Sequence, residues 1–267
     1  TAGNAKPRLF RLPADNAIIN RLGLNGDGCD AVAARLRQCK MPLPLAVNIA
    51  KTNDPAIKGD AAINDQVSSF IAVRDLPLAY VTLNASCPNT HEGILAAKEE
   101  LDAVLAQFQK ENRRNIPLFV KLSPDSSDRV LEDFVAVSGD RGIAGFVCGN
   151  TTVSRTGLRT GSADVAAMGA GGLSGPPLKD SGLALVSKVS RLKSREQEII
   201  GCGGIGSGKD ALAFIKAGAS AVQIYTALVY QGPAAPARIN RELAALVKQE
   251  GCSLQELVGS AAAAGAL

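Results

Sequence analysis

The stretch EIIGCGGIGSGKDALAFIKAGASAVQIYT, residues 198–226, holds the repeating unit of this protein. It begins with a short apolar run, continues through a glycine-rich turn, becomes amphipathic over 209–217 and ends in a second apolar run. A buried strand, a turn and a covering helix produce this pattern. The stretch therefore predicts a β-strand, an α-helix and a second β-strand in succession.

The same alternation extends over the rest of the chain. Short apolar, β-branched runs predict six strands, at 43–49, 79–83, 117–122, 145–148, 198–201 and 221–225. Helical patterns lie around and between them, at 30–39, 64–73, 92–110, 127–138, 180–192, 209–217 and 234–248. Strands of near-continuous apolar character are typical of a parallel sheet with both faces covered, which leaves a doubly wound sheet or a barrel.

The residues that follow the strands favour the barrel. A polar or glycine-rich cluster follows every predicted strand, as expected where all strand ends face one central site. A doubly wound sheet would concentrate its site at one switch point. We therefore expect an α/β fold of the (β/α)8 TIM-barrel class, with about six of the eight βα units present in a single domain over residues 1–267.

Composition excludes several functional classes. The formal charge of +4 over 267 residues is small, and basic and acidic residues are mixed, so no nucleic-acid footprint is expected. Six cysteines without CxxC spacing and a single histidine offer few zinc ligands, so we expect no metal site and reduced thiols. No apolar run approaches the ~20 residues of a membrane span.

The segment GCGGIGSGKDA, residues 201–211, predicts a phosphate site. Glycines after a buried strand let backbone amides approach a phosphate, and the next helix offers its positive N-terminus. Tyr225 and Thr226 end the next predicted strand, where barrels often complete such a site. The alternative is a glycine turn that only packs a helix.

Lys121 lies inside an otherwise apolar predicted strand. Burial of an ammonium without a partner is costly, which predicts an anionic partner for this side chain. The alternative is a lysine at the strand end that extends to water.

Motifs at the strand ends, taken together and in order, resemble the dihydroorotate dehydrogenases over essentially the whole chain. The resemblance is closest to the class 2 branch, through GNxxPRxFRLP, INRxGxN, and NTTVSR followed by GGLSGxPL. The motifs are GNAKPRLFRLPADNAIINRLGLNGDG (3–28), VNIAKTND (47–54), NASCPNT (84–90), VKLSPD (120–125), GNTTVSR (149–155), GCGGIGSGKDA (201–211) and IYTALVYQGP (224–233).

The resemblance implies an FMN enzyme that oxidises (S)-dihydroorotate to orotate in de novo pyrimidine biosynthesis. A quinone would reoxidise the flavin, at the bacterial or mitochondrial inner membrane. The implied FMN-binding residues are Asn48, Asn84, Lys121, Ser174, Gly175, Gly203, Gly204, Tyr225 and Thr226. The implied substrate-binding residues are Asn20, Arg21, Leu22, Gly23, Leu24, Asn84, Asn89, Asn150 and Thr151.

Two kinds of side chain give these assignments their chemistry. The matching lysine of the family meets the flavin ring where negative charge develops on reduction, so a fixed cation there stabilises the reduced form. Asparagines donate to and accept from a ring of amides such as dihydroorotate. Individually, each asparagine is more often a turn or cap residue.

Cys87 occupies the family's general-base position, where class 2 enzymes typically carry serine and class 1 enzymes cysteine. In the family this base takes the proton from ring C5 while hydride leaves C6 for flavin N5. A thiol near its ordinary pKa of ~8.5 is partly thiolate at neutral pH, which suits this role. The alternative is a buried structural cysteine, which we expect for the other five, Cys29, Cys39, Cys148, Cys202 and Cys252.

The chain departs from the class 2 pattern in several places. Leu24 replaces an aromatic residue, and Gly149 stands where threonine is frequent. His91 is expected to be a solvated loop residue. Family members begin with two more barrel strands, so we expect this sequence to be N-terminally incomplete, with any membrane-associating segment in the missing part.

Two alternatives to the class 2 function remain open from the sequence. Cys87 favours a class 1-type or dihydropyrimidine-oxidising barrel that uses fumarate or NAD, which would be cytoplasmic. A non-catalytic barrel remnant that keeps its flavin-site residues only by descent is the other.

Overall fold

The computed structural model describes residues 1–85 and 94–263, and the chain divides into two compact units. The first unit consists of Thr1–Ala5, Leu22–Lys121 and Ser126–Gly145. The second consists of Lys6–Arg21, Leu122–Asp125 and Phe146–Leu267.

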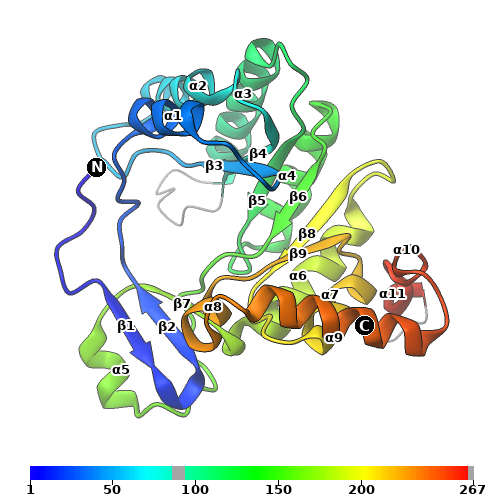
Figure 1. The fold of residues 1–267 in the computed structure, drawn as a ribbon. Helices are drawn as coiled ribbons and strands as arrows, with labels where there is room; N and C mark the ends of the chain where they lie inside the picture. The colour runs from blue at the N-terminus through cyan, green and yellow to red at the C-terminus, as the bar shows by residue number, and fades with distance from the viewer. Residues whose placement is uncertain (86–93, 264–267) are drawn as a thin grey trace. The chain divides into compact units, whose positions relative to one another are not determined.

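The first unit alternates helices and parallel strands (Figure 1). Its strands are hydrogen-bonded in the order β3-β4-β5 and keep parallel register, with Asn84 opposite Lys121. The elements are α1 (Cys29–Gln38), β3 (Leu45–Ile49), α2 (Asp60–Val73), β4 (Leu78–Asn84), α3 (Ile94–Glu111), β5 (Leu118–Leu122) and α4 (Asp128–Asp140).

The core of the first unit forms where α2 and α3 pack together. The buried positions Ala62, Gln66, Phe70 and Val73 recur at helical spacing on α2. Phe70 stacks on Phe108 of α3, with ring centroids 4.6 Å apart. Burial of aromatic rings in this geometry contributes about 0.5–1.5 kcal/mol beyond the buried area.

The second unit contains three further parallel strands in the order β6-β8-β9 and a small antiparallel sheet in the order β1-β2-β7. Its strands are β1 (Leu9–Leu12), β2 (Ala17–Asn20), β6 (Gly145–Cys148), β7 (Gly172–Ser174), β8 (Glu198–Cys202) and β9 (Ala221–Gln223). Its helices are η1 (Pro13–Asp15), α5 (Ser162–Met168), η2 (Pro176–Leu178), α6 (Lys179–Leu192), α7 (Gly208–Ala217), α8 (Thr226–Gln231), α9 (Ala235–Glu250), α10 (Leu254–Leu257) and α11 (Ser260–Ala263).

The ring of Phe214, on α7, leaves no room for a side chain at two glycine positions of the second unit. This fully buried ring lies where side chains at Gly182 and Gly201 would stand. A Cβ at Gly201 would fall 2.6 Å from Phe214 Cδ1, and one at Gly182 would fall 2.9 Å from Cζ. Gly201 is therefore a helix-packing glycine, as the alternative interpretation of the 201–211 segment predicted for the whole turn.

The antiparallel sheet has a small core of its own. Leu12 and Ile19 of the β1–β2 hairpin pack with Leu173 of β7 and Val165 of α5. Figure 1 shows α5 beside this hairpin. Buried Asp15, at the hairpin turn, accepts hydrogen bonds from the backbone N–H of Arg159 (2.7 Å) and of Thr160 (3.0 Å), and one from the Thr160 hydroxyl.

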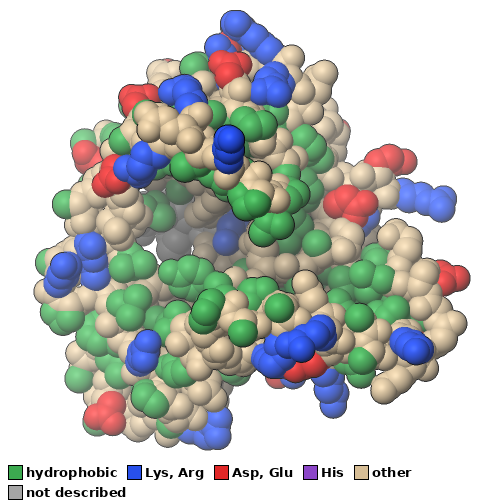
Figure 2. All heavy atoms as spheres, in the orientation of Figure 1, with side chains coloured by type: hydrophobic (Ala, Val, Ile, Leu, Met, Phe, Trp, Pro, Cys, Tyr) green, Lys and Arg blue, Asp and Glu red, His purple; other side chains and the backbone are tan. Residues whose placement is uncertain are grey.

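The predicted strands and helices all appear within a few residues of their expected bounds. The largest difference is at α2, which begins at Asp60 instead of 64, and β9 ends at Gln223 instead of 225. In the described part of the chain, no helix is long and apolar enough to cross a membrane. Basic and acidic side chains are interspersed over the described residues on the face shown in Figure 2.

Candidate active site

Three glycines of the predicted phosphate site adopt backbone conformations that favour glycine. Gly175, Gly203 and Gly204 have φ values of +108°, +121° and +72°. A Cβ at Gly204 would fall 2.7 Å from Lys179 N, and one at Gly175 would fall 2.8 Å from Asn16 O. The backbone at Gly175 and Gly204 therefore packs directly against other backbone, with no room for a side chain.

The start of α8 is joined to the end of β7 beside these glycines. Thr226 donates its hydroxyl to Ser174 Oγ at 2.9 Å, and Ser174 in turn donates to Ile18 O at 3.3 Å. Within the described residues, nothing accepts a hydrogen bond from the backbone N–H groups of Gly203, Gly204, Tyr225 or Thr226. Amides without protein acceptors, in a turn without side chains, are what a phosphate requires.

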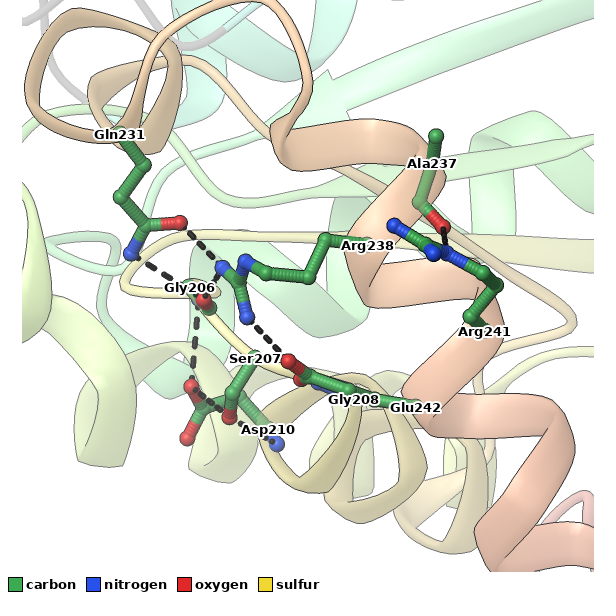
Figure 3. A network of polar contacts seen from close by, with 9 residues as sticks. All are labelled: Gly206, Ser207, Gly208, Asp210, Gln231, Ala237, Arg238, Arg241 and Glu242. Atoms are coloured by element: carbon green, nitrogen blue, oxygen red, sulfur yellow. Dashed lines mark hydrogen bonds and ion pairs between the residues drawn. The ribbon is translucent and has the colours of Figure 1, made fainter.

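Carboxylates from α7 and α9 hold the turn that follows Gly204 (Figure 3). Asp210 accepts hydrogen bonds from Gly206 N–H (3.2 Å) and Ser207 Oγ (2.7 Å), while Glu242 accepts from Gly208 N–H (2.7 Å). Arg238 donates to Gly206 O at 2.8 Å. The first amide of α7 thus already has an acceptor, so the helix N-terminus is less open to a phosphate than we expected from the sequence.

Asp210 also pairs with Lys179 Nζ at 3.1 Å. Burial acts to raise the pKa of this carboxyl, but hydrogen bonds from Ser207, Lys179 and Gly206 outweigh it, so the net pKa is below its ordinary value. Asp210 is therefore a charged anchor that keeps the glycine turn in place.

Part of the predicted substrate set converges on Gly172 of β7. Asn20 ends β2 opposite Gly172 and donates its side-chain amide to Gly172 O at 3.4 Å. A Cβ at Gly172 would fall 2.1 Å from Thr151 Oγ1. The Asn150 side chain accepts from Thr151 N–H at 2.9 Å. The structure therefore brings Asn20 and Thr151 together within the second unit.

Arg21 is held by backbone carbonyls and an aromatic ring of the second unit. Its guanidinium donates to the carbonyls of Met168 and Ala170, the latter at 3.3 Å, and lies 4.8 Å from the centroid of the Phe10 ring. These contacts fix the loop before β7.

Asp125 and Arg155 hold the loop after β6, a role that the sequence did not indicate. Asp125 accepts from Thr152 Oγ1 and Val153 N–H, and Arg155 donates to Gly171 O at 2.6 Å. Their presence in VKLSPD and NTTVSR was the only available signal, because the contacts join distant residues.

Gly149, at the end of β6, departs from the class 2 pattern for a steric reason. Its φ is +138°, and a Cβ there would fall 1.9 Å from Cys202 O. A threonine would require a different path for the backbone at this position.

The predicted flavin residues of the first unit lie on its strands. Lys121 ends the pairing of β5 with β4 and is half-buried, and its ammonium makes no hydrogen bond or ion pair with any described residue. Asn84 is its half-buried neighbour on β4. Asn48, on β3, is exposed. The half-buried ammonium of Lys121 is therefore able to pair with an anionic group of a ligand.

Residues 22–24 pass over the surface of the first unit. Leu24 is 47% exposed with φ +52°, and its carbonyl accepts from Thr1 Oγ1 at 2.9 Å. A Cβ at Gly23 would fall 2.6 Å from the Asn4 side chain. Leu22 accepts at its carbonyl from Asn4 N–H at 3.1 Å.

Cys87, Asn89 and His91 lie outside the described residues. Cys29, Cys39, Cys148, Cys202 and Cys252 are free thiols. Cys148 is fully buried, which raises the pKa of its thiol, as expected of a structural cysteine. The expectation of burial is wrong for Cys39, which is exposed because it follows the last turn of α1, and Cys29, Cys202 and Cys252 are only partly buried. No group of three potential metal ligands occurs among the described residues.

The chain is similar to known proteins over most of its length. The sequence profile described as dihydroorotate dehydrogenase matches residues 1–247. Dihydroorotate dehydrogenase (quinone) of Thermobifida fusca is 41% identical over 268 residues, which cover 96% of this chain and 70% of that protein. The protein of the same name from Chloroflexus aurantiacus is 42% identical over 252 residues, and the match covers 90% of this chain and 68% of that protein.

A solved structure confirms the predicted fold class. The structure of ligand-free DHODH from Eimeria tenella matches with a TM-score of 0.86 at 32% identity, over 97% of this chain and 78% of that chain. The predicted parallel strands and helices therefore form part of a (β/α) barrel. On its profile and its relatives, the chain belongs to the dihydroorotate dehydrogenase family, among the class 2, quinone-type members.

Proposed function

We propose that this protein oxidises (S)-dihydroorotate to orotate in pyrimidine biosynthesis, with FMN as its flavin and a quinone as the final electron acceptor. The observation that carries the proposal is the glycine turn at Gly203 and Gly204, whose amides have no acceptor among the described residues. The chain belongs to a family of flavin enzymes, which such a turn would serve as a phosphate site.

The proposed cofactor contacts follow from donor chemistry. Backbone amides of Gly175, Gly203, Gly204 and Thr226 would bind the phosphate of FMN, with Tyr225 beside them. Asn48 and Asn84 would bind the ring through their side-chain amides, and Ser174 supports the loop. A flavin bound there supplies a two-electron acceptor for hydride.

Lys121 would supply fixed positive charge to the ring. A half-buried ammonium with no anionic partner among the described residues stabilises negative charge more strongly than one in water, because the local dielectric is lower. Its main effect is therefore expected on the rate of substrate oxidation.

The proposed substrate contacts come from amide and backbone groups. Asn20, Asn84, Asn89 and Asn150 would hydrogen-bond the ring amides and carboxylate, with Thr151 beside them. Arg21, Leu22, Gly23 and Leu24 would shape the entrance, and for Arg21 the contacts to Met168 and Ala170 favour support over direct binding.

Cys87 is the proposed general base. Its thiolate would take the C5 proton as hydride leaves C6, which leaves the thiol protonated and orotate as the product. Proton release to solvent restores the base.

The acceptor and the place of action follow from the class 2 assignment. Quinones dissolve in membranes, so we propose that the protein works at the face of a bacterial or mitochondrial inner membrane. A fumarate- or NAD-linked reaction is the alternative that cysteine at position 87 favours. Turnover with a soluble quinone analogue, but not with fumarate or NAD, would support the first and exclude the second.

The decisive test is the absorbance of the full-length protein. As purified it should be yellow, and anaerobic dihydroorotate should bleach the flavin bands. A folded protein that takes up no added FMN, or that keeps its colour with dihydroorotate, would contradict the proposal.

A further inference from the structure

Asp125 binds the loop that follows β6 through both of its carboxylate oxygens. Oδ1 accepts from Thr152 Oγ1 at 2.5 Å, and Oδ2 accepts from Val153 N–H at 2.9 Å. Thr152 is buried, with 7% of its surface exposed, whereas Val153 is 66% exposed. The carboxylate therefore fixes a point at which the chain passes from the interior to solvent.

Thr152 is held from every side by this arrangement. Its hydroxyl donates to Asp125 and also accepts from Ser154 N–H at 3.0 Å. Its backbone exchanges two hydrogen bonds with Leu173 of β7, at 3.1 Å and 2.8 Å. Thr152 thus links Asp125, through its side chain, to the small antiparallel sheet, through its backbone.

The fixed position of Thr152 also restricts the two residues before it. Asn150 and Thr151 stand between the end of β6 and the fixed Thr152, so their backbone has little freedom. Thr151 Oγ1 also lies against Gly172, in the space a Cβ would take. A shift of Thr152 would therefore move Thr151 into or away from the β7 backbone.

We propose that Asp125 is a positioning residue, which acts through Thr152 to orient Asn150 and Thr151 toward the substrate. The inference rests on the proposed function and deepens it, since it names what sets the geometry of the substrate amide contacts. Neither Asp125 nor Thr152 is required to touch dihydroorotate.

A carboxylate suits this position because it accepts from both groups at once and carries charge. An asparagine could still accept from Val153 N–H, but its NH2 group could only donate to Thr152 Oγ1, which reverses that hydrogen bond and removes its charge. Hydrogen bonds to a charged acceptor are also the stronger kind. The Thr152 hydroxyl is the side-chain partner that the proposed link to Asp125 requires.

The experiment compares four variants of the full-length, flavin-loaded enzyme. Asp125→Asn removes the charge and reverses the hydrogen bond to Thr152, Thr152→Val removes the hydroxyl, and Thr152→Ser keeps it. Asp15→Asn is the control, at a buried carboxylate, whereas Asp125 is exposed. Asp15 makes the same kind of bonds, to a threonine hydroxyl and to two backbone N–H groups, but it holds residues 159 and 160. The readouts are the Kd of orotate, from its perturbation of the flavin spectrum, and anaerobic stopped-flow reduction by dihydroorotate.

Asp125→Asn and Thr152→Val should each weaken orotate binding about tenfold, the effect of one charge-assisted hydrogen bond, and slow reduction at low substrate. Thr152→Ser should bind orotate within about twofold of the parent. Asp15→Asn should unfold more easily and bind orotate as the parent does.

Three outcomes would overturn the inference. Parent-like orotate Kd and reduction in both Asp125→Asn and Thr152→Val would show that Asp125 is only structural. An equal loss in Asp15→Asn would show a general effect of instability, and failure of Thr152→Ser to keep orotate affinity would exclude the hydroxyl link. A parent enzyme that neither binds orotate nor is bleached by dihydroorotate would instead refute the proposed function on which the inference rests.

Discussion

Gly204→Ala tests whether the glycine turn is built for close approach, and Gly251→Ala is its matched control. Both glycines have φ of +72°, but a Cβ at Gly204 would fall 2.7 Å from Lys179 N, whereas one at Gly251 would meet nothing within 4 Å. The pair therefore shares the cost of the positive φ and differs in the steric conflict.

The expected free energies of unfolding follow from these two terms. Gly251→Ala should lose only the cost of a left-handed L-residue, ~1–2 kcal/mol. Gly204→Ala should lose that amount plus the ~1–3 kcal/mol of an overpacked contact, because the neighbour is backbone and has to shift. Denaturant titration of the two apoproteins measures the difference.

The same substitution should weaken FMN binding. Displacement of one amide from a charged phosphate loses a hydrogen bond of ~1.5–3 kcal/mol, or about 10- to 100-fold in Kd. Quenching of flavin fluorescence on titration with apoprotein gives this value directly. If Gly204→Ala bound FMN as tightly as Gly251→Ala, the phosphate assignment would be wrong.

Four further predictions concern charge and chemistry. Lys121→Ala should slow anaerobic flavin reduction at saturating dihydroorotate far more than it weakens FMN retention, and reduction at the parent rate would make the lysine structural. Cys87→Ala should retain FMN but reduce about 10²- to 10⁴-fold more slowly, and Cys87→Ser should recover only part of the rate; unchanged rates and pH profiles would exclude a base at this position. Arg238→Met should weaken FMN binding several-fold by removing one of the two side-chain hydrogen bonds to Gly206 O, the other being from Gln231 Nε2. Arg241→Met should not, since Arg241 contacts only Ala237 O of its own helix in the network of Figure 3; equal Kd values would contradict this. Asp210 has a folded pKa below its ordinary value of 3.8, so its contribution to stability should be present above about pH 4 and lost as the pH falls through the folded pKa. Asp210→Asn should therefore flatten the acid limb of a curve of unfolding free energy against pH, and parallel curves for parent and variant would contradict this.

The parallel strands and their helices were predictable because each is a local pattern. The strand over 145–148, for example, is apolar throughout and buried throughout. Amphipathic spacing likewise located α4, which begins one residue after its Ser127 N-cap. Local sequence periodicity carries this information without any knowledge of tertiary contacts.

The antiparallel sheet was not predictable on the same basis. β7 has three residues and β1 and β2 have four, too few for a periodic pattern. Their pairing joins Ile18 to Ser174, across most of the chain. The strands exist because of the long-range ladder, which single-sequence patterns do not encode.

The candidate site divides in the same way. Gly203 and Gly204 were identified from their position after a buried strand, and their φ values fit that prediction. The role of Asp125 was not predictable from local sequence, because its partners, Thr152 and Val153, are 27 and 28 residues away along the chain. The roles of Cys87 and of the substrate asparagines remain predictions.

The bridge between Thr152 and Leu173 makes residues 153–172 a self-closed excursion. The chain leaves Thr152, which lies after the end of β6, and returns at Leu173 beside the same residue, so the two ends of this segment are held together whatever its length. Thr156 is exposed, and Gly157 has open space around it. Loops closed at the base lose little stability when they lengthen, about 0.6 kcal/mol for each doubling. Further along, residues 159 and 160 bond to Asp15 and Val165 packs in the hairpin core. The turn at Thr156 and Gly157 is therefore where an inserted peptide or a fluorescent label should leave the strand ends unchanged.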